Sequence, residues 1–285
     1  MTAAGGRPGP PPGARPGPPP GAGGGQGQPA AGQGPDAGME SLYPFLYAGS
    51  GDLDAVLEEI RRSTVAKAGE IVALRELVLD RERDHLVACA EAMARRFAAG
   101  GRLFAFGNGG GATDAQDLVA LFLNPPAGPG PGGLERAGPG QLERARPLPA
   151  LSLTSDVATL TALANDIGFE VVFARQLAAF ARPGDVAVGL STSGNSDNLV
   201  RAFDEAARRG LLTVGLAGYE GGRMAELDTI DYLFVVPSAS VHRIQEAQTT
   251  VYHVLWELTQ AQLEEMGDGV SASRRAARRS PARPG

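Results

Sequence analysis

The chain has 285 residues, of which 43% are hydrophobic and 20% charged, and its formal net charge is −6, which is ordinary for a soluble globular protein. No segment has the length and purity of a membrane span, and the N-terminus lacks the apolar stretch of a signal peptide, so we expect a cytoplasmic protein without a membrane partner. The single cysteine, Cys89, excludes an intramolecular disulfide framework and fits a small core residue.

Both ends of the chain differ in composition from its centre. Residues 1–38 repeat Gly/Pro-rich blocks with almost no large aliphatic side chains, so they are expected to be disordered. Residues 267–285 are predicted to form a second disordered tail, which carries five arginines close to its end. A basic tail can attract polyanions, but no aromatic residue is interleaved to stack on bases. Nucleic acid is therefore an unlikely partner.

Residues 40–266 suit one α/β domain with an N-terminal helical extension. Between Asp52 and about Gly100 the apolar residues recur at helical spacing, which predicts two long helices broken near Asp80–Asp84. Long amphipathic helices in front of an α/β core need a packing partner. They are therefore candidates for the interface of a homo-oligomer.

Short apolar runs then alternate with helical patterns. Strands are predicted at 102–107, 148–153, 185–190, 211–216 and 232–237, and helices at 111–123, 156–164, 169–181, 195–209 and about 243–266. This alternation indicates a parallel sheet of about five strands covered by helices on both faces, which is a three-layer αβα sandwich. A Gly/Pro-rich segment at about 124–147 interrupts the pattern and is predicted to be an exposed loop insertion.

The turn after the third predicted strand, GLSTSGNSDN, begins a helix and is rich in hydroxyl groups. One helix cap needs one hydroxyl, whereas here four of them surround Gly194: Ser191, Thr192, Ser193 and Ser196. The unpaired backbone N–H groups of a helix N-terminus attract phosphate, and a glycine lets the backbone come close. No Gly-Lys-Ser/Thr follows, so the pattern favours a phosphate cradle other than that of a nucleoside triphosphatase.

The turn after the first predicted strand, FGNGGGATDAQD, admits two interpretations. Its spacing of Gly107, Gly109 and Ala112 fits the G-x-G-x-x-A fingerprint of dinucleotide-binding proteins. That fingerprint requires an acidic residue at the end of the next strand, which here ends in Ser152–Leu153–Thr154. We therefore expect a sugar phosphate, and no nucleotide cofactor.

Five segments, in the right order and spread over about residues 45–262, resemble the phosphoheptose isomerases of the sugar-isomerase (SIS) family: GNGGGATDAQ, LTALANDIGFEVVFARQL, PGDVAVGLSTSGNSDNL, LLTVGLAGYEGG and RIQEAQ. The resemblance implies a SIS-type fold, a homotetramer and interconversion of sedoheptulose 7-phosphate and a heptose 7-phosphate through an enediol. It also implies substrate contacts from the four hydroxyl residues of the cradle and from Asn108, Gly109, Gly110, Asn165, Asp166 and Gln245.

The resemblance further implies a catalytic set from which this chain departs. The family uses a His and a Glu four residues apart after the Gly-rich loop, and these positions hold Asp117 and Leu121. The last helix keeps Gln245 and His253, which are eight residues apart on one helix face. His253 is then the expected acid and Asp117 the substitute base. Because Asp117 lies one turn from the family's base, the usual mechanism is expected to be very slow.

In the family, the same side chains can hold zinc. Asp117, Gln245 and His253 are therefore the candidate ligands for a zinc ion, although this set is poorer for zinc than one with two histidines and a carboxylate. The main functional hypothesis is a phosphosugar-binding protein of phosphoheptose isomerase type. The alternative is a non-catalytic SIS adaptor that binds a protein partner through its surface.

Overall fold

The computed structural model describes residues 53–125 and 145–279, so the predicted N-terminal tail and most of the predicted insertion lie outside the described residues. The chain divides into two units, Met1–Glu58 and Glu59–Gly285, and the second contains the sheet and all the helices that cover it. In the described part, no helix is long and apolar enough to cross a membrane.

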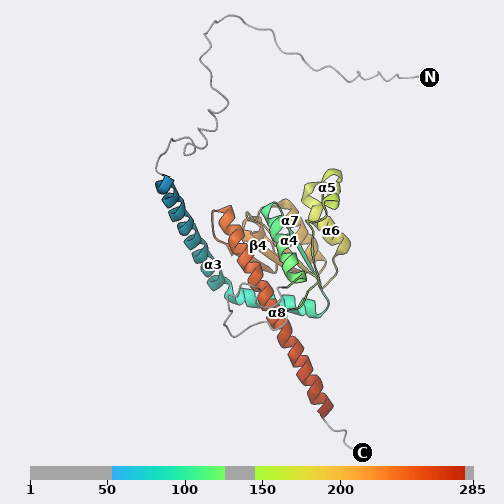
Figure 1. Ribbon diagram of the computed structural model, residues 1–285. Helices are drawn as coiled ribbons and strands as arrows, with labels where there is room; N and C mark the ends of the chain where they lie inside the picture. Colours follow the sequence, from blue (N-terminus) through green and yellow to red (C-terminus); the bar gives the residue numbers. More distant parts are fainter. Residues whose placement is uncertain (1–52, 126–144, 280–285) are drawn as a thin grey trace, which may run out of the picture. The chain divides into compact units, whose positions relative to one another are not determined.

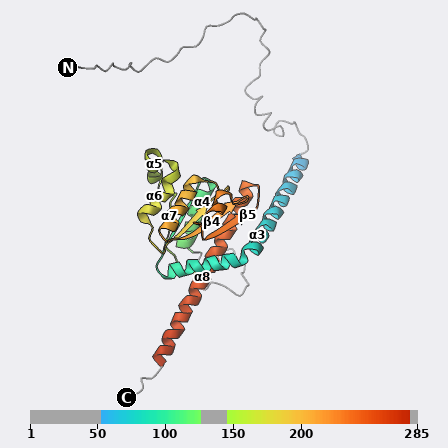
Figure 2. The same ribbon diagram turned by 180° about the vertical axis from the view of Figure 1, so that it is seen from behind.

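The N-terminal helical extension is a single helix, α3 (Leu53–Ala98), so the predicted break near Asp80–Asp84 is wrong. This segment contains neither Gly nor Pro, its charged side chains are mostly exposed, and Arg83 pairs with Asp80 one turn away. The helical hydrogen bonding therefore continues, although Figures 1 and 2 show the helix axis changing direction. The helix ends at Ala98, just before the predicted Gly100–Gly101 pair, and Gly100 has a φ of 89°, which glycine adopts readily.

The five predicted strands are confirmed: β1 (Leu103–Gly107), β2 (Ala150–Ser152), β3 (Val186–Leu190), β4 (Leu212–Gly218) and β5 (Tyr232–Val236). They form one parallel sheet in the order β2-β1-β3-β4-β5. Every residue of β1, β3 and β4 is buried, which explains why these strands are continuous apolar runs.

Helices cover both faces of the sheet, as predicted. The remaining elements are α4 (Gly110–Leu123), α5 (Val157–Asp166), η1 (Phe169–Val171), α6 (Val172–Phe180), α7 (Asp197–Arg208), η2 (Gly222–Glu226) and α8 (Val241–Arg279). One hydrophobic cluster packs α3, α4 and α8 against the sheet, and a second packs α6 and α7 against the opposite face. Figure 1 shows α4 and α8 on the near side of the sheet, and Figure 2 shows α6 and α7 on the other side.

The last helix is longer than its sequence pattern predicts. It continues from residue 267 to Arg279, where the pattern predicts the start of a disordered tail. The apolar periodicity indicates only the part that packs on the domain, up to about Leu263, which is the last buried residue of the core cluster on this helix.

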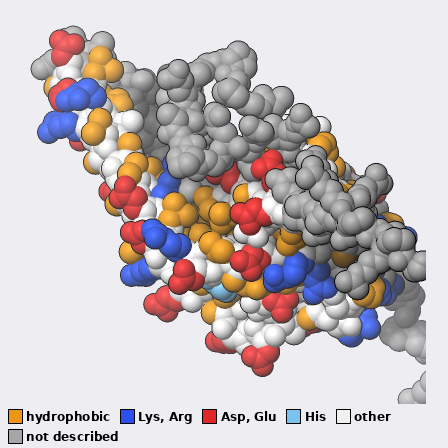
Figure 3. Space-filling view, turned by 90° about the horizontal axis from the view of Figure 1, so that it is seen from below, with side chains coloured by type: hydrophobic (Ala, Val, Ile, Leu, Met, Phe, Trp, Pro, Cys, Tyr) orange, Lys and Arg blue, Asp and Glu red, His pale blue; other side chains and the backbone are white. Residues whose placement is uncertain are grey.

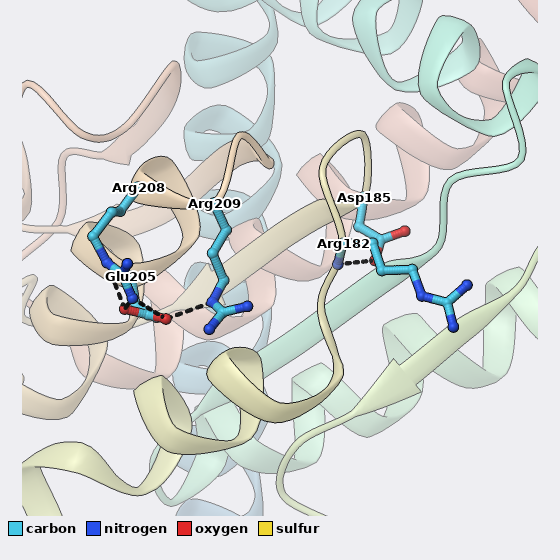
Figure 4. Close-up of polar contacts among 5 residues, drawn as sticks. All are labelled: Arg182, Asp185, Glu205, Arg208 and Arg209. Atoms are coloured by element: carbon cyan, nitrogen blue, oxygen red, sulfur yellow. Dashed lines mark hydrogen bonds and ion pairs between the residues drawn. The ribbon is translucent and has the colours of Figure 1, made fainter.

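Polar contacts fix the end of the sheet where β3 begins. Asp185, whose side chain is 4% exposed, accepts hydrogen bonds from the backbone N–H groups of Arg102 and Arg182 and pairs with the Arg102 guanidinium. At the end of α7, Glu205 pairs with Arg208 and Arg209 (Figure 4). Asp185 stands at the amino end of its strand, the end opposite to the one where ligands of parallel sheets bind, so we assign it a structural role.

Candidate functional site

The two motif loops lie side by side at the carboxyl edge of the sheet. Strands β1 and β3 are neighbours, and Gly107 is aligned with Leu190 at their ends. Asn108 and Asn198 exchange two amide hydrogen bonds, each 2.9 Å long, which tie the Gly-rich loop to the first turn of α7. The fold thus brings together segments that are about ninety positions apart in the sequence.

The Gly-rich loop needs its glycines because other groups approach its backbone closely. A Cβ atom on Gly111 would lie 2.8 Å from the carbonyl oxygen of Leu190, and one on Gly110 would lie 1.8 Å from Nε2 of Gln245. Gly109 has a φ of 55°. The Gln245 side chain therefore lies directly against Gly110, as expected for two residues of one site.

The hydroxyl-rich loop has the form of a cradle at the start of α7. Ser191 Oγ accepts a hydrogen bond from the backbone N–H of Gly194 at 2.9 Å, and Gly194 adopts a φ of 68°. Ser193 Oγ accepts from the N–H of Asn195 at 3.3 Å. The hydroxyls of Thr192 and Ser196 make no hydrogen bond to any residue in the described parts of the chain. These two hydroxyls are available to a ligand.

Ser196 is the N-cap residue of α7, yet its side chain does not cap the helix. The backbone N–H groups of the first turn therefore lack the side-chain acceptor that an N-cap serine ordinarily provides. Asp197, the acidic residue of this turn, pairs with Arg223, which compensates its negative charge. Together with the two available hydroxyls, this helix start suits a phosphate group.

Helix α8 supplies a residue to the cradle that the sequence analysis missed. Gln248, which is 1% exposed, donates from Nε2 to the backbone carbonyl of Ser191 at 3.1 Å. Its Oε1 atom is buried and has no hydrogen-bond partner among the residues described. The only sequence signal is its position three residues after Gln245, which places both on one face of the helix.

Two side-chain hydrogen bonds join α4 to α8. Tyr252 donates its hydroxyl proton to Oδ2 of Asp117 at 2.6 Å, and Gln245 donates from Nε2 to Oδ2 of Asp114 at 3.4 Å. His253 Nε2 lies 3.9 Å from the same oxygen of Asp117, and its ring stacks on that of Tyr252. The predicted pair of Asp117 and His253 is thus brought together.

Asp114 and Tyr252 are site residues that the sequence analysis did not identify. Asp114 precedes Asp117 by three residues, so helical spacing alone places the two carboxylates on one face. Tyr252 lies in an apolar run, and only the folded structure shows that its buried ring directs the hydroxyl to α4. Both belong to the contact between α4 and α8.

The pKa values of Asp114 and Tyr252 are both raised above those of exposed aspartate and tyrosine side chains. Burial raises the pKa of Asp114 above its usual range, the hydrogen bond from Gln245 opposes this, and the charge of Asp117 adds to it. Burial also raises the pKa of Tyr252, followed by its hydrogen bond to Asp117, so the phenol keeps its proton at neutral pH.

Asn165 and Asp166 lie apart from this cluster, at the exposed C-terminal end of α5. Asn165 donates to Asp166 at 2.8 Å, and neither makes a hydrogen bond to α4 or α8 within residues 53–125 and 145–279. Their predicted contact with a substrate therefore stays a prediction.

The donor set fits zinc poorly. Asp117 Oδ2 is occupied by the Tyr252 hydroxyl, and the fourth family position holds Leu121, which packs against the core. Over the part of the chain that the structure describes, no three His, Cys, Asp or Glu side chains are grouped to hold a metal ion. One imidazole and one already engaged carboxylate form a weak site for this cation.

Comparisons with known proteins agree with the fold and the motifs. Residues 134–218 match the SIS domain family. The chain is 41% identical to a phosphoheptose isomerase of Nitratidesulfovibrio vulgaris (strain Miyazaki F) over 71% of this chain and 89% of the relative. It is 39% identical to the enzyme of that name from Aquifex aeolicus, over 72% and 96%.

The solved structure of a phosphoheptose isomerase from Neisseria gonorrhoeae matches with a TM-score of 0.59 and 32% identity, covering 69% of this chain and 96% of the other. A phosphoheptose isomerase from Francisella tularensis matches with a TM-score of 0.54 and 29% identity. The chain therefore belongs to the phosphoheptose isomerase family of SIS-domain proteins.

Proposed function

We propose that this protein binds a phosphorylated sugar with its phosphate in the cradle at the start of α7. The observation that carries this proposal is the pair of available hydroxyls, Thr192 and Ser196, beside a helix N-terminus without a side-chain cap. A phosphate there accepts from hydroxyls and backbone N–H groups alike. We expect the sugar itself to lie along the Gly-rich loop, near Asn108 and Gln245.

The reaction we propose is the aldose–ketose isomerisation of sedoheptulose 7-phosphate and a heptose 7-phosphate, catalysed slowly. Relatives of about 40% identity carry the name phosphoheptose isomerase. Leu121 cannot accept a proton, and a positioned general base typically contributes about 10²–10⁴-fold to a rate. We therefore expect turnover lower than that of the relatives by a factor of this order, without a requirement for zinc.

Calorimetric titration with sedoheptulose 7-phosphate tests the binding site. Thr192→Val and Ser196→Ala each remove a hydroxyl that bonds to an anion, so each should weaken binding by about 10- to 100-fold. Thr64→Val, on an exposed part of α3, is the matched control and should bind as the unaltered protein does. Equal affinity in all four proteins would contradict the proposed cradle.

We also propose that the protein is a cytoplasmic homo-oligomer of four subunits. Helix α3 exposes several large aliphatic side chains, among them Ile60, Val65 and Val72, each more than half exposed. Figure 3 shows such hydrophobic side chains among the charged ones on this helix, at the upper left. Light scattering during gel filtration measures the mass in solution. A monomer would favour the alternative, in which this surface binds another protein.

A further inference from the structure

Three positions on α4 are considered for the base of the proposed reaction: Asp114, Asp117 and Leu121, which stands where the family has a Glu. Leu121 is excluded by its chemistry, since a hydrocarbon side chain has no lone pair with which to accept a proton. Asp117 and Asp114 remain, and they lie one turn apart on the same helix face. The contacts of these two carboxylates decide between them.

Asp117 is held by a hydrogen bond from Tyr252. Its Oδ2 atom accepts the Tyr252 hydroxyl at 2.6 Å, and His253 Nε2 lies 3.9 Å from the same atom. At this length the hydrogen bond is strong, so it holds the Asp117 carboxylate toward Tyr252 and α8. The Tyr252 ring is 2% exposed, so the donor is held in place by packing and does not swing away readily.

Asp114 lies next to a side chain that contacts the Gly-rich loop. It lies four residues after Gly110. Its carboxylate accepts a hydrogen bond from Gln245, whose side chain lies against Gly110. At 3.4 Å this bond is long and restrains the carboxylate weakly. Asp114 is also less exposed than Asp117. Of the two carboxylates, Asp114 is therefore the one that is less restrained by its contacts and lies beside a side chain that touches the Gly-rich loop.

We propose that Asp114, and not Asp117, is the general base of this site, and that Asp117 and Tyr252 form a fixed link between α4 and α8. This inference rests on the proposed function, because it assigns a step of the proposed isomerisation. Gln245 then lies between the Asp114 carboxylate and Gly110, beside the proposed position of the sugar.

The step balances without a further reactant. The Asp114 carboxylate takes the proton from the carbon next to the sugar carbonyl, and the C–H electron pair forms the double bond of the enediol. The carbonyl oxygen takes a proton from an acid, for which His253 is the candidate. Asp114 then returns its proton to the former carbonyl carbon, while the hydroxyl on the neighbouring carbon gives its proton to the deprotonated His253 and becomes the new carbonyl.

Single substitutions in the full-length protein separate the two carboxylates. Asp114→Asn should lower kcat for sedoheptulose 7-phosphate by about 10²-fold or more, while the affinity measured by calorimetry changes less than about threefold. Asp117→Asn should lower kcat by less than about tenfold and should lower the melting temperature. Asp84→Asn, an exposed carboxylate on α3, is the matched control and should match the unaltered protein in all three measurements.

Each other outcome contradicts the inference. A loss of kcat that is larger for Asp117→Asn than for Asp114→Asn would assign the base to Asp117. If the unaltered protein shows no turnover but binds the sugar phosphate in a Thr192-dependent way, Asp114 is not a base, while the proposed binding function stands. If the sugar phosphate does not bind at all, the proposed function itself fails.

Discussion

Replacing Tyr252 by phenylalanine removes one hydrogen bond and leaves the buried ring in place. The bond joins the phenol to a carboxylate at 2.6 Å, a class that contributes about 1.5–3 kcal/mol to stability. The Asp117 side chain is 61% exposed, so water can replace the lost donor and the contribution falls somewhat below this range. We expect Tyr252→Phe to lower the free energy of unfolding by about 1 kcal/mol.

Urea denaturation measures this change, and a double-mutant cycle with Asp117→Ala isolates the contact. The coupling energy between the two substitutions should be about 1 kcal/mol, because each removes the same bond. The urea dependence of the free energy should stay the same, since the surface exposed on unfolding hardly changes. If the two substitutions are additive, the phenol and the carboxylate do not interact in solution, and the link between α4 and α8 is refuted.

Three further outcomes are expected. Asp185→Ala should cost about 2 kcal/mol of stability in urea denaturation, because it removes the buried acceptor of two part-buried backbone N–H groups, and a cost below about 0.5 kcal/mol would contradict this. Reversal to the family pair, Asp117→His with Leu121→Glu, should raise kcat by about 10²-fold and create a zinc site seen by metal analysis, whereas Asp117→His alone should not raise kcat. Because burial raises the pKa of Asp114, the folded protein binds its proton more tightly than the unfolded chain does. The contribution of Asp114 to the free energy of unfolding therefore falls as the pH rises from about 4 through the pKa that Asp114 has in the folded protein. The difference in urea midpoint between the unaltered protein and Asp114→Asn, followed from pH 4 to 7, should decline; a constant difference would show that the carboxyl is not desolvated.

Much of the fold could be predicted from the sequence because its signals are local. The strands β1, β3 and β4 are buried on both faces, so they are apolar runs that no other element of that length produces. The loops after β1 and β3 owe their form to glycines that must admit a close backbone approach, such as Gly111 beside Leu190. The departure from the family at Leu121 was equally visible in the sequence, because it needs only the spacing within one motif.

Local signals failed where exposure decides the outcome. A run of charged residues near Asp80–Asp84 can end a helix or cover the exposed side of one, and in α3 it does the latter. The predicted end of α8 comes too early for a related reason. Apolar periodicity marks where a helix packs on the domain and not where the helix ends.

The sequence by itself determined the sheet, the hydroxyl-rich loop at the start of α7 and the absence of the family's base. Only the tertiary structure decided what the remaining carboxylates contact. Asp114 and Asp117 are equivalent in the sequence, as two aspartates on one helix face. They differ because α8 packs across α4 in a register that places a phenol on Asp117 and an amide on Asp114. That register is set by side chains more than a hundred positions away along the chain, which no local pattern can report.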